Sequence, residues 1–500
     1  MSQGVSSASA TLGKGRSSAY SPCTIAKMRD APNINAGCGM RGAFAVTLAS
    51  ATKLAPPACQ RTALRGPRKR RIYLPVSSSN YEIENVPCPF CGLACDDLRI
   101  AVAEGKLEVR ANACPISQRA FARAGKDSGA QTRVMGAPVP LAEAVDHAAR
   151  ILRGARQPLV CGLATDVAGA RSALALADRF GAVIDHMGAA AKLRNLLVLQ
   201  DAGWITTTLT EARNRADLLI LVGTDVVSRF PRFFERIVWV RETLFGLDPG
   251  AREIVYLGEA KDTDAGIAPD GRKPTIIPCE NGRLGEVLGA LRALVAGRRV
   301  PRDEIAGVPL ATLACLGERM KQSKYGVAAW AAGDLAFPHA ELTVQILTDL
   351  IRDLNRTTRF NGLALAGSDG DFTFNQVHTW QTGFPFRTSL ASGHPIYDPY
   401  HFSTDRLLAS GEADALLWVS SLNASRLPPA AAIPTIVLGA GSMELAQEPD
   451  VFIAVATPGI DTSGHFYRAD KVVALPLRKL RESPLPSAAA ALDAILNALG

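Results

Sequence analysis

Short apolar runs alternate with amphipathic segments along most of the chain. Residues 141–153 repeat apolar positions at helical spacing, and the apolar run 158–163 that follows has the length of a strand. The alternation continues with an expected helix at 167–180 and further strands beyond it. Near-continuous apolar strands between helices are typical of parallel sheets buried on both faces. We therefore expect an α/β fold, with parallel sheets flanked by helices.

The expected elements form two series, separated by segments rich in Gly, Pro and charge. The first series has strands at 158–163, 182–185 and 218–223 and helices at 141–153, 167–180 and 193–200. The second has strands at 327–331, 363–366, 415–420, 435–438, 451–454 and 472–475 and helices at 338–354 and 487–498. We predict α/β domains at 139–260 and 321–500, joined by a linker and helical segment at 261–320.

Four of the expected strands end in short turns of small and polar residues. Ligands of α/β folds bind at the carboxyl ends of parallel strands, where helix N-termini offer free N–H groups to phosphates. No complete G-x-G-x-x-G or Walker A motif is present, so these turns predict no dinucleotide or ATP site. The turns lie at 162–165, 223–225, 367–370 and 420–423.

The formal net charge of +8 is unevenly distributed along the chain. Residues 1–80 contain 12 Lys or Arg and a single acid, Asp30, so they carry +11 and the remaining 420 residues carry −3. We expect residues 1–80 to be a basic, disordered leader or an over-extended start; the alternatives are a transit peptide and nucleic-acid binding through the run 68–71. The body is not basic, so we expect no nucleic-acid partner. Its longest apolar runs are strand-sized, so we expect no membrane span.

Four of the ten cysteines crowd into the 27 residues from Cys88 to Cys114. Cys88, Cys91 and Cys95 follow a C-x2-C-x3-C spacing, and Cys114 completes the set. Four thiolates at this spacing can hold one zinc ion or a cubane iron–sulfur cluster, and the spacing does not separate the two. An empty site with free thiols is the alternative. The other cysteines are scattered through a chain without an export signal, which favours the cytoplasm.

The module at 81–138 that contains these cysteines resembles the N-terminal module of the formylmethanofuran dehydrogenase B subunit. The shared pattern is Cys-Pro-Phe-Cys-Gly-x-x-Cys-Asp-Asp, a short β-pair and then Asn-Ala-Cys. The likeness continues in the segments 157–162, 181–185, 208–223, 230–232 and 464–470. It implies a multi-domain molybdopterin-oxidoreductase-like fold. It also implies that Cys88, Cys91, Cys95 and Cys114 hold a [4Fe–4S] cluster beside a bis-pterin molybdenum or tungsten centre.

The chain departs from this family pattern between Asp185 and Gln200. Redox-active members carry Cys-His-Gly there, and the Cys ligates the metal. The aligned positions here are Ala191 and Lys192, and no cysteine lies between Cys161 and Cys279. An alanine cannot ligate a metal, and a lysine cannot replace imidazole as a ligand at neutral pH. We therefore expect neither a molybdenum or tungsten bis-pterin centre nor redox catalysis by this chain.

The departure points to the family's relative in methylotrophic bacteria, the B subunit of the formyltransferase/hydrolase complex. That complex moves a formyl group between tetrahydromethanopterin and methanofuran and hydrolyses it to formate. The resemblance implies a non-redox scaffold in formaldehyde-to-formate metabolism. It also implies amidohydrolase-type, formyltransferase-type and small scaffold subunits as partners. An active molybdenum or tungsten oxidoreductase subunit is the alternative, and a zinc-module nucleic-acid binder is a third.

Three further groups of residues are weaker candidates. The histidines show no metal-ligand spacing and are expected to be structural or exposed: His378, His394, His401 and His465. The aromatic segment 372–400 could line a pocket, form a subunit interface or pack in the core. Three arginines allow two interpretations, a face that binds an anionic partner or pterin phosphates, and a helix face exposed to solvent: Arg229, Arg232 and Arg236.

Overall fold

The computed structural model describes residues 80–124 and 131–498. Residues 75–500 form one compact unit, which contains every element named below. The leader predicted for 1–80 lies outside the described residues, except for Asn80. Within the described ranges, no helix combines the length and apolarity needed to cross a membrane. The class is mixed α/β with parallel sheets, as the hydrophobic pattern predicted.

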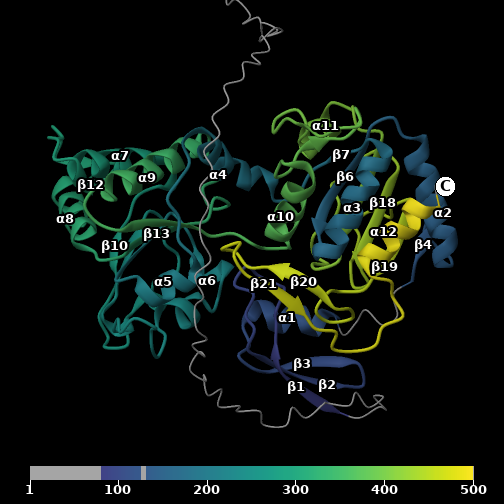
Figure 1. Cartoon of the computed structure of the whole chain (residues 1–500), viewed down its shortest axis with the longest axis horizontal. Helices are drawn as coiled ribbons and strands as arrows, with labels where there is room; N and C mark the ends of the chain where they lie inside the picture. The colour runs from purple at the N-terminus through teal and green to yellow at the C-terminus, as the bar shows by residue number, and fades with distance from the viewer. Residues whose placement is uncertain (1–79, 125–130, 499–500) are drawn as a thin grey trace, which may run out of the picture. The chain divides into compact units, whose positions relative to one another are not determined.

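The described part of the chain begins with a small antiparallel module (Figure 1). Its elements are β1 (Tyr81–Val86), β2 (Leu98–Ala103), β3 (Lys106–Ala111) and α1 (Pro115–Ala124). The turn between β2 and β3 falls at Glu104-Gly105, and both residues have positive φ angles, 49° and 76°. The hairpin expected there is confirmed. Three of the four cysteines lie on the loop between β1 and β2.

A five-stranded parallel sheet follows, in the order β10-β9-β8-β13-β14. Its strands are β10 (Thr275–Ile277), β9 (Glu253–Leu257), β8 (Leu218–Val222), β13 (Gly326–Trp330) and β14 (Phe360–Ala364). One face packs on α4 (Ala189–Ala202), α7 (Leu284–Val295), α8 (Leu310–Gln322) and α9 (Ala340–Leu354). The other face packs on α5 (Leu209–Arg215), α6 (Val226–Arg229), the π-helix η2 (Phe234–Val238) and the cysteine module. One hydrophobic core therefore joins the module to this sheet.

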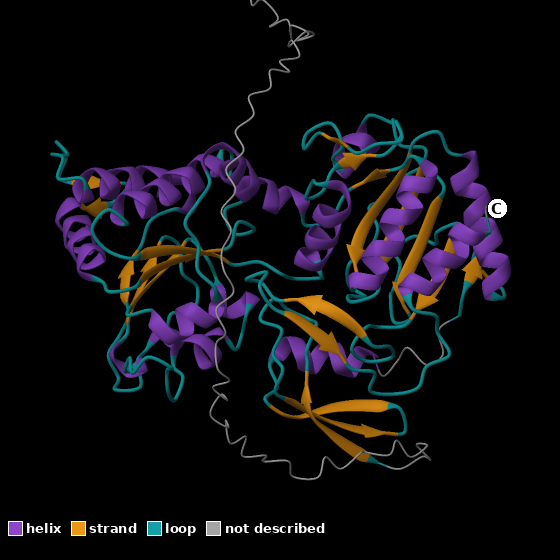
Figure 2. Ribbon diagram, in the orientation of Figure 1, coloured by secondary structure: helices purple, strands orange, loops and turns teal. Residues whose placement is uncertain are grey.

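The larger sheet has nine strands, in the order β16-β15-β7-β6-β17-β18-β19-β4-β5. The strands are β4 (Arg133–Val134), β5 (Ala137–Pro138), β6 (Pro158–Ala164), β7 (Val183–Ile184), β15 (Thr388–Ser389), β16 (Ile396–Tyr397), β17 (Ala415–Ser420), β18 (Thr435–Ala440) and β19 (Val451–Val455). The five central strands, β7 to β19, are parallel and the edge strands are antiparallel. Figure 2 shows the helices that cover this sheet.

One face of the nine-stranded sheet is covered by α2 (Leu141–Gly154), α3 (Val167–Phe180), α10 (Asp371–Thr382) and α12 (Ala488–Asn497). The short helix α11 (Thr404–Ala409) lies against the other face. The residues at the two ends of α3 show why the helix begins and ends where it does. The carboxylate of Asp166 accepts a hydrogen bond from the Gly169 amide at 3.1 Å, and Gly181 ends the helix in the left-handed region.

The two large sheets each combine strands from both predicted α/β domains, 139–260 and 321–500. Strands β6 and β7 come from the predicted domain 139–260, yet they belong to the same sheet as β17 of the predicted domain 321–500, which pairs with β6. Conversely, β13 and β14 come from 321–500 and join the sheet of β8, which pairs with β13. The hydrophobic pattern predicts where a strand lies in the sequence but not which strand it pairs with in the sheet. Parallel neighbours are joined by long crossover connections, so they can be far apart in the sequence.

The last predicted strand, 472–475, also has a different partner. It corresponds to β21 (Ala474–Leu477), which pairs antiparallel with β20 (Gly464–Tyr467) and joins neither large sheet. A second hairpin, β11 (Glu304–Ile305) with β12 (Val308–Pro309), falls in the predicted linker segment. Short strands of this kind carry too few residues for an alternation to predict their pairing.

Gly162 provides a test of the nine-stranded sheet. It lies inside β6 with φ of 79°, and a Cβ there would lie 2.8 Å from both the Val419 carbonyl oxygen and the Trp418 ring. We predict that Gly162→Ala lowers the free energy of unfolding by about 3 kcal/mol, because strain at positive φ and overpacking each cost about 1–3 kcal/mol. Denaturant unfolding of the full chain measures the effect.

Gly289→Ala is the matched control for this prediction. Gly289 lies within α7, and among the described residues no atom outside its own helix lies within 4 Å of the added Cβ. That substitution should be neutral or stabilising, by up to about 1 kcal/mol, because alanine favours helix interiors. Equal effects of the two substitutions would contradict the packing described for β6 and β17.

Candidate metal centre and the adjoining pocket

The four cysteines come from two neighbouring segments of the N-terminal module. The amide of Cys88 donates to the carbonyl of Cys95 at 2.7 Å, which closes the loop that contains the first three cysteines. Cys88, Cys91 and Cys95 are buried, and Cys114 is partly exposed at the start of α1. The Ser117 amide donates to the Cys114 Sγ at 3.4 Å, so this sulfur is also held in place.

The thiols of this cluster are close enough to influence one another. Burial is the main cause that raises the pKa of Cys88 well above its ordinary value, and the neighbouring Cys91, Cys95 and Cys114 raise it further. Burial likewise raises the pKa of Cys91 to about 12 and that of Cys95 to about 11. Four thiolates therefore require a positive partner in this position, and a metal or a metal cluster supplies one.

The donor set fits such a group in its chemistry. It consists of thiols alone, as in zinc sites with four cysteine ligands and in cubane iron–sulfur clusters. Within residues 80–124 and 131–498, however, no three Cys, His, Asp or Glu side chains converge closely enough to hold a single metal ion. The role of the four cysteines as ligands stays a prediction.

Two arginines anchor the segment that follows Cys95. Arg232 is 5% exposed, and its guanidinium donates to both carboxylate oxygens of Asp97, at 2.7 and 2.8 Å. Arg236 contacts Asp96 at 2.7 Å and Asp97 at 2.6 Å. Both arginines also act to lower the pKa of Cys95, against the larger effect of burial. They therefore place positive charge beside the cysteine loop.

This network replaces the two interpretations that the sequence offered for the arginines. Arg232 is buried rather than solvated, and its guanidinium is bound by Asp97 and Glu235. Arg229, the third residue of the group, donates to Asp334 at 2.8 Å. Asp96 and Asp97 were part of the cysteine motif, but spacing alone could not indicate that partners lie 135 residues or more away.

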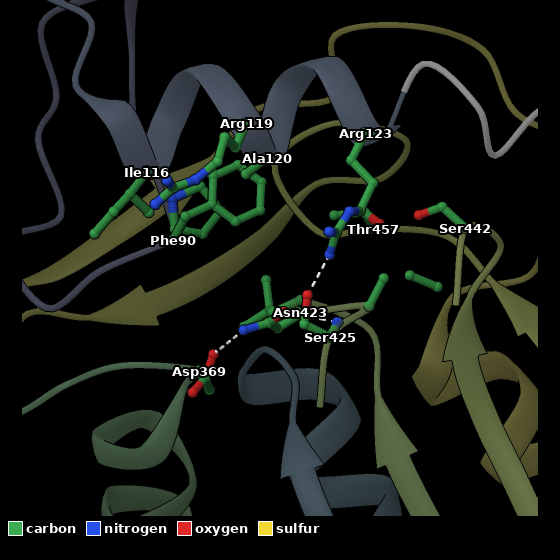
Figure 3. Close-up of a pocket in the computed structure, with 15 residues that line it drawn as sticks. Phe90, Ile116, Arg119, Ala120, Arg123, Asp369, Asn423, Ser425, Ser442 and Thr457 are labelled. Carbon is green, nitrogen blue, oxygen red and sulfur yellow. Dashed lines mark hydrogen bonds between the residues drawn. The ribbon is translucent and has the colours of Figure 1, made fainter. Parts of the chain in front are cut away.

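A pocket of about 220 Å³ adjoins the cysteine loop (Figure 3). It lies between α1 and the carboxyl ends of strands in the nine-stranded sheet. Its walls combine apolar, hydroxyl and guanidinium groups: Pro89, Phe90, Ile116, Arg119, Arg123, Asp369, Asn423, Ser425, Ser442 and Thr457. Asn423 donates to Asp369 at 2.6 Å, and Arg123 donates to the hydroxyl of Ser425. Guanidinium and hydroxyl groups of this kind suit a polar or anionic ligand.

Three of the four predicted strand-end turns meet beside this pocket. Ser421 donates to the hydroxyl of Thr165 at 3.0 Å, and a Cβ on Gly370 would lie 2.7 Å from the Thr165 carbonyl. The fourth turn, 223–225, belongs to the other sheet and bonds to Asp334. Three of the turns noted in the sequence therefore lie together at the edge of the sheet beside this pocket. Arg119 and Arg123 were missed from the sequence, where the only signal was their i, i+4 spacing after Cys114.

Ala191 and Lys192 lie in the first turn of α4. Lys192 is 9% exposed, although a lysine in a helix is ordinarily solvated. Its ammonium donates to Asn375 and lies 3.5 Å from the carboxylate of Asp371. The sequence indicated the position but not these partners, since both belong to α10.

The four candidate histidines do not form a common site. His378 is fully buried in α10, where its Nδ1 lies 2.5 Å from the Phe384 carbonyl. His401 is exposed and pairs with Asp398 at 2.7 Å. His394 and His465 are exposed. The expectation of structural or surface roles agrees with these positions.

The aromatic segment 372–400 divides between core and surface. Phe374 and Phe386 are core residues of the nine-stranded sheet. Trp380 is 54% and Tyr400 is 60% exposed, although Trp380 also packs edge-on against Tyr467. Core packing therefore explains only part of the segment.

His378 predicts a specific acid sensitivity. Burial lowers its pKa from 6.5 to about 4, so the folded chain keeps it neutral where the unfolded chain protonates it. Stability should therefore fall as the pH drops from 6.5 to about 4, by up to about 3 kcal/mol from this group. We predict that His378→Asn removes this part of the pH dependence, measured by unfolding of the full chain at several pH values.

The control for this prediction is His339→Asn. The side chain of His339 is 79% exposed, and asparagine tolerates its positive φ of 59°. A profile unchanged by His378→Asn, or changed equally by both substitutions, would show that the buried ring does not carry the effect.

Comparison with known proteins shows which family the chain belongs to. No family model matches the chain. It is 28% identical over 415 residues to the B subunit of the tungsten-containing formylmethanofuran dehydrogenase 2 of Methanocaldococcus jannaschii, and the match covers 80% of this chain and 94% of that protein. The corresponding protein of Methanococcus maripaludis is 26% identical over 415 residues, and this match also covers 80% of this chain and 94% of that protein. The B subunit of the formyltransferase/hydrolase complex Fhc of Methylorubrum extorquens is 31% identical over 339 residues, 66% of this chain and 86% of that protein.

Two solved structures resemble the fold. One is the crystal structure of the FhcABCD complex from Methylorubrum extorquens with methylofuran, with a TM-score of 0.62 and 28% identity over 74% of this chain and 98% of the matched chain. The other is acetylene hydratase from Pelobacter acetylenicus, with a TM-score of 0.57; the match covers 84% of this chain and 69% of the matched chain. At 9% identity, this likeness shows the fold alone. The chain belongs to the family of formylmethanofuran dehydrogenase B subunits, which includes the B subunit of the formyltransferase/hydrolase complex.

Proposed function

We propose that this chain is the B subunit of a formyltransferase/hydrolase complex in methanofuran-linked one-carbon metabolism, where it acts as a non-redox scaffold. The family relationship and the likeness to the FhcABCD complex support this function. The observation that carries the non-redox part is the environment of Ala191 and Lys192. The methyl group of Ala191 offers no ligand, and the buried ammonium of Lys192 already pairs with protein groups.

The molybdenum or tungsten bis-pterin centre does not fit these residues. A metal in this position needs a deprotonated sulfur, selenium or nitrogen donor, and Ala191 has none. The Lys192 ammonium would also place a positive charge against the metal. We derive no redox step for this chain, and we assign no catalytic residue to it.

The four cysteines fit a [4Fe–4S] cluster, and we propose Cys88, Cys91, Cys95 and Cys114 as its ligands. Such a cluster supplies a one-electron carrier, which would be a remnant in a non-redox subunit. Zinc and an empty site remain the alternatives. The resemblance to the formylmethanofuran dehydrogenase B subunit is the reason to propose the cubane cluster, since four thiol donors alone also suit zinc. Arg232 and Arg236 hold the segment after Cys95 in either case.

The proposal extends to the fold and the partners. The fold would be molybdopterin-oxidoreductase-like, with the four-cysteine module preceding the two sheets. The partners would be an amidohydrolase-type, a formyltransferase-type and a small scaffold subunit, consistent with the FhcABCD complex. We propose a cytoplasmic location, in keeping with the free thiols of the described cysteines. Neither nucleic acid nor a membrane is a proposed partner.

The second candidate is an active oxidoreductase subunit. It is favoured by the retention of all four cysteines and by the 28% identity to a tungsten-containing relative over 80% of this chain. The two candidates differ in one chemical outcome. Oxidation of a formyl group to carbon dioxide releases two electrons, whereas its hydrolysis to formate releases none.

We predict that the complex containing this chain, purified without oxygen, releases formate from a formylated methanofuran-type substrate and does not reduce a viologen dye. Formate release and dye reduction are measured on the same preparation. Omission of this chain should prevent assembly of the complex and abolish formate release, as expected for a scaffold. Dye reduction in step with substrate consumption would establish the oxidoreductase instead.

A further inference from the structure

The ammonium of Lys192 makes its close contacts with a single helix. It donates to the side-chain oxygen of Asn375 and lies 3.5 Å from the Oδ2 of Asp371. It also lies 4.2 Å from the centre of the Phe372 ring. Asp371, Phe372 and Asn375 belong to the first turns of α10, so this one side chain joins α4 to α10.

The carboxylate of Asp371 depends on this lysine. Asp371 is 6% exposed, and its Oδ1 makes no hydrogen bond within the described part of the chain. Lys192 provides the cation at ion-pair distance. Lys471 also acts on Asp371 electrostatically, and although the residue is exposed as a whole, burial lowers the pKa of its ammonium. Its Nζ lies 4.9 Å from the centre of the Phe372 ring, and among the described residues it forms no ion pair with Asp371. Burial of a carboxylate without a paired cation is strongly unfavourable.

The ammonium form is the relevant one near neutral pH. Burial lowers the pKa of Lys192 to about 8, while Asp371 acts in the opposite direction. The lysine therefore remains mostly protonated at pH 7. Contact with the face of Phe372 adds a favourable cation–π interaction.

The same contacts reach the cysteine loop. The Phe372 ring packs beside Gly367, where a Cβ would lie 3.3 Å from its Cδ2. The same Cβ would lie 2.8 Å from the Cα of Gly92, in the loop that carries the cysteines. Lys192 thus supports, through Phe372 and Gly367, the backbone on which the cysteine loop rests.

We propose that the Lys192 ammonium is the buried cation that stands in place of the family's redox metal: it neutralises Asp371 and fastens α4 to α10. This inference rests on the proposed function only in taking residues 191 and 192 as the former metal position. The ionic fastening itself stands on the contacts of Lys192. A buried ion pair of this kind adds little net stability, because the desolvation of its two charges costs about as much as their attraction gains. Removal of only one partner is strongly destabilising, because the other charge is then buried without compensation.

The test uses the full chain, produced together with its partner subunits, and three variants. Lys192→Met leaves Asp371 buried without its cation. The double variant Lys192→Met with Asp371→Leu replaces the pair by apolar groups. Lys471→Met is the matched control, because it also removes a lysine beside Phe372, but one that forms no ion pair with Asp371 among the described residues. Hydrogen–deuterium exchange is followed in peptides from α4, from α10 and from the loop 86–96.

We expect Lys192→Met to accelerate exchange in α4 and α10 by roughly tenfold or more, with a smaller effect in the cysteine loop, because an unpaired buried charge favours local opening. The double variant should recover most of the protection, and Lys471→Met should change it little. If Lys192→Met does not fold, folding of the double variant supports the proposal. Unchanged exchange in Lys192→Met, or a double variant at least as impaired as the single one, would overturn it.

The metal content of the unmodified complex separates this inference from the proposed function. Molybdenum or tungsten in the complex would contradict the non-redox function and the replacement of the metal together. A complex free of both metals, with no effect of Lys192→Met, would contradict only the ionic fastening.

Discussion

The position of the candidate metal centre depends on a place where two backbones meet without side chains between them. A Cβ on Gly92 would lie 2.1 Å from the carbonyl oxygen of Ala366, so only glycine fits in the cysteine loop at this point. On its other side, the Gly92 carbonyl accepts a hydrogen bond from the Ala469 amide at 2.7 Å. The loop is thereby fixed against two segments that lie more than 270 residues further along the chain. Any change that separates these backbones would move three of the four cysteines.

The segments through which the sequence resembles its family surround this contact. Arg232 of the Phe-Pro-Arg segment binds Asp97, which closely follows the last cysteine of the loop. Ala469 lies in the late segment 464–470 and holds Gly92, and the neighbouring Asp470 accepts from the Leu209 amide at 3.1 Å. Two of the recognisable segments, 230–232 and 464–470, therefore position the cysteine loop. In the function that we propose, the residues that would have held a redox metal have changed, whereas the contacts that position the cysteine loop are kept.

Much of the fold could be predicted from the pattern of apolar residues, because each helix and each buried strand carries its own periodicity. The helix 167–180 and the strand 415–420 agree with α3 and β17 at both ends. The assignment of strands to two sheets could not be predicted, since the pairing of β6 with β17 spans some 250 residues and leaves no local signal. The same limit applies to the site. The four cysteines are close in sequence, so they could be proposed as ligands from the sequence, whereas the positions of Asp371 and the arginines of α1 depend on tertiary packing.

We propose that this chain retains a cysteine site, whereas protein groups stand where its relatives hold a redox metal. The most direct test is elemental analysis, with an ultraviolet–visible spectrum, of the complex purified without oxygen. The account predicts about four iron atoms per chain, the broad absorption of an iron–sulfur cluster, and neither molybdenum nor tungsten. A Cys91→Ser variant should lose most of the iron. Stoichiometric molybdenum or tungsten would contradict the account, because Ala191 and Lys192 would then not have displaced the redox centre.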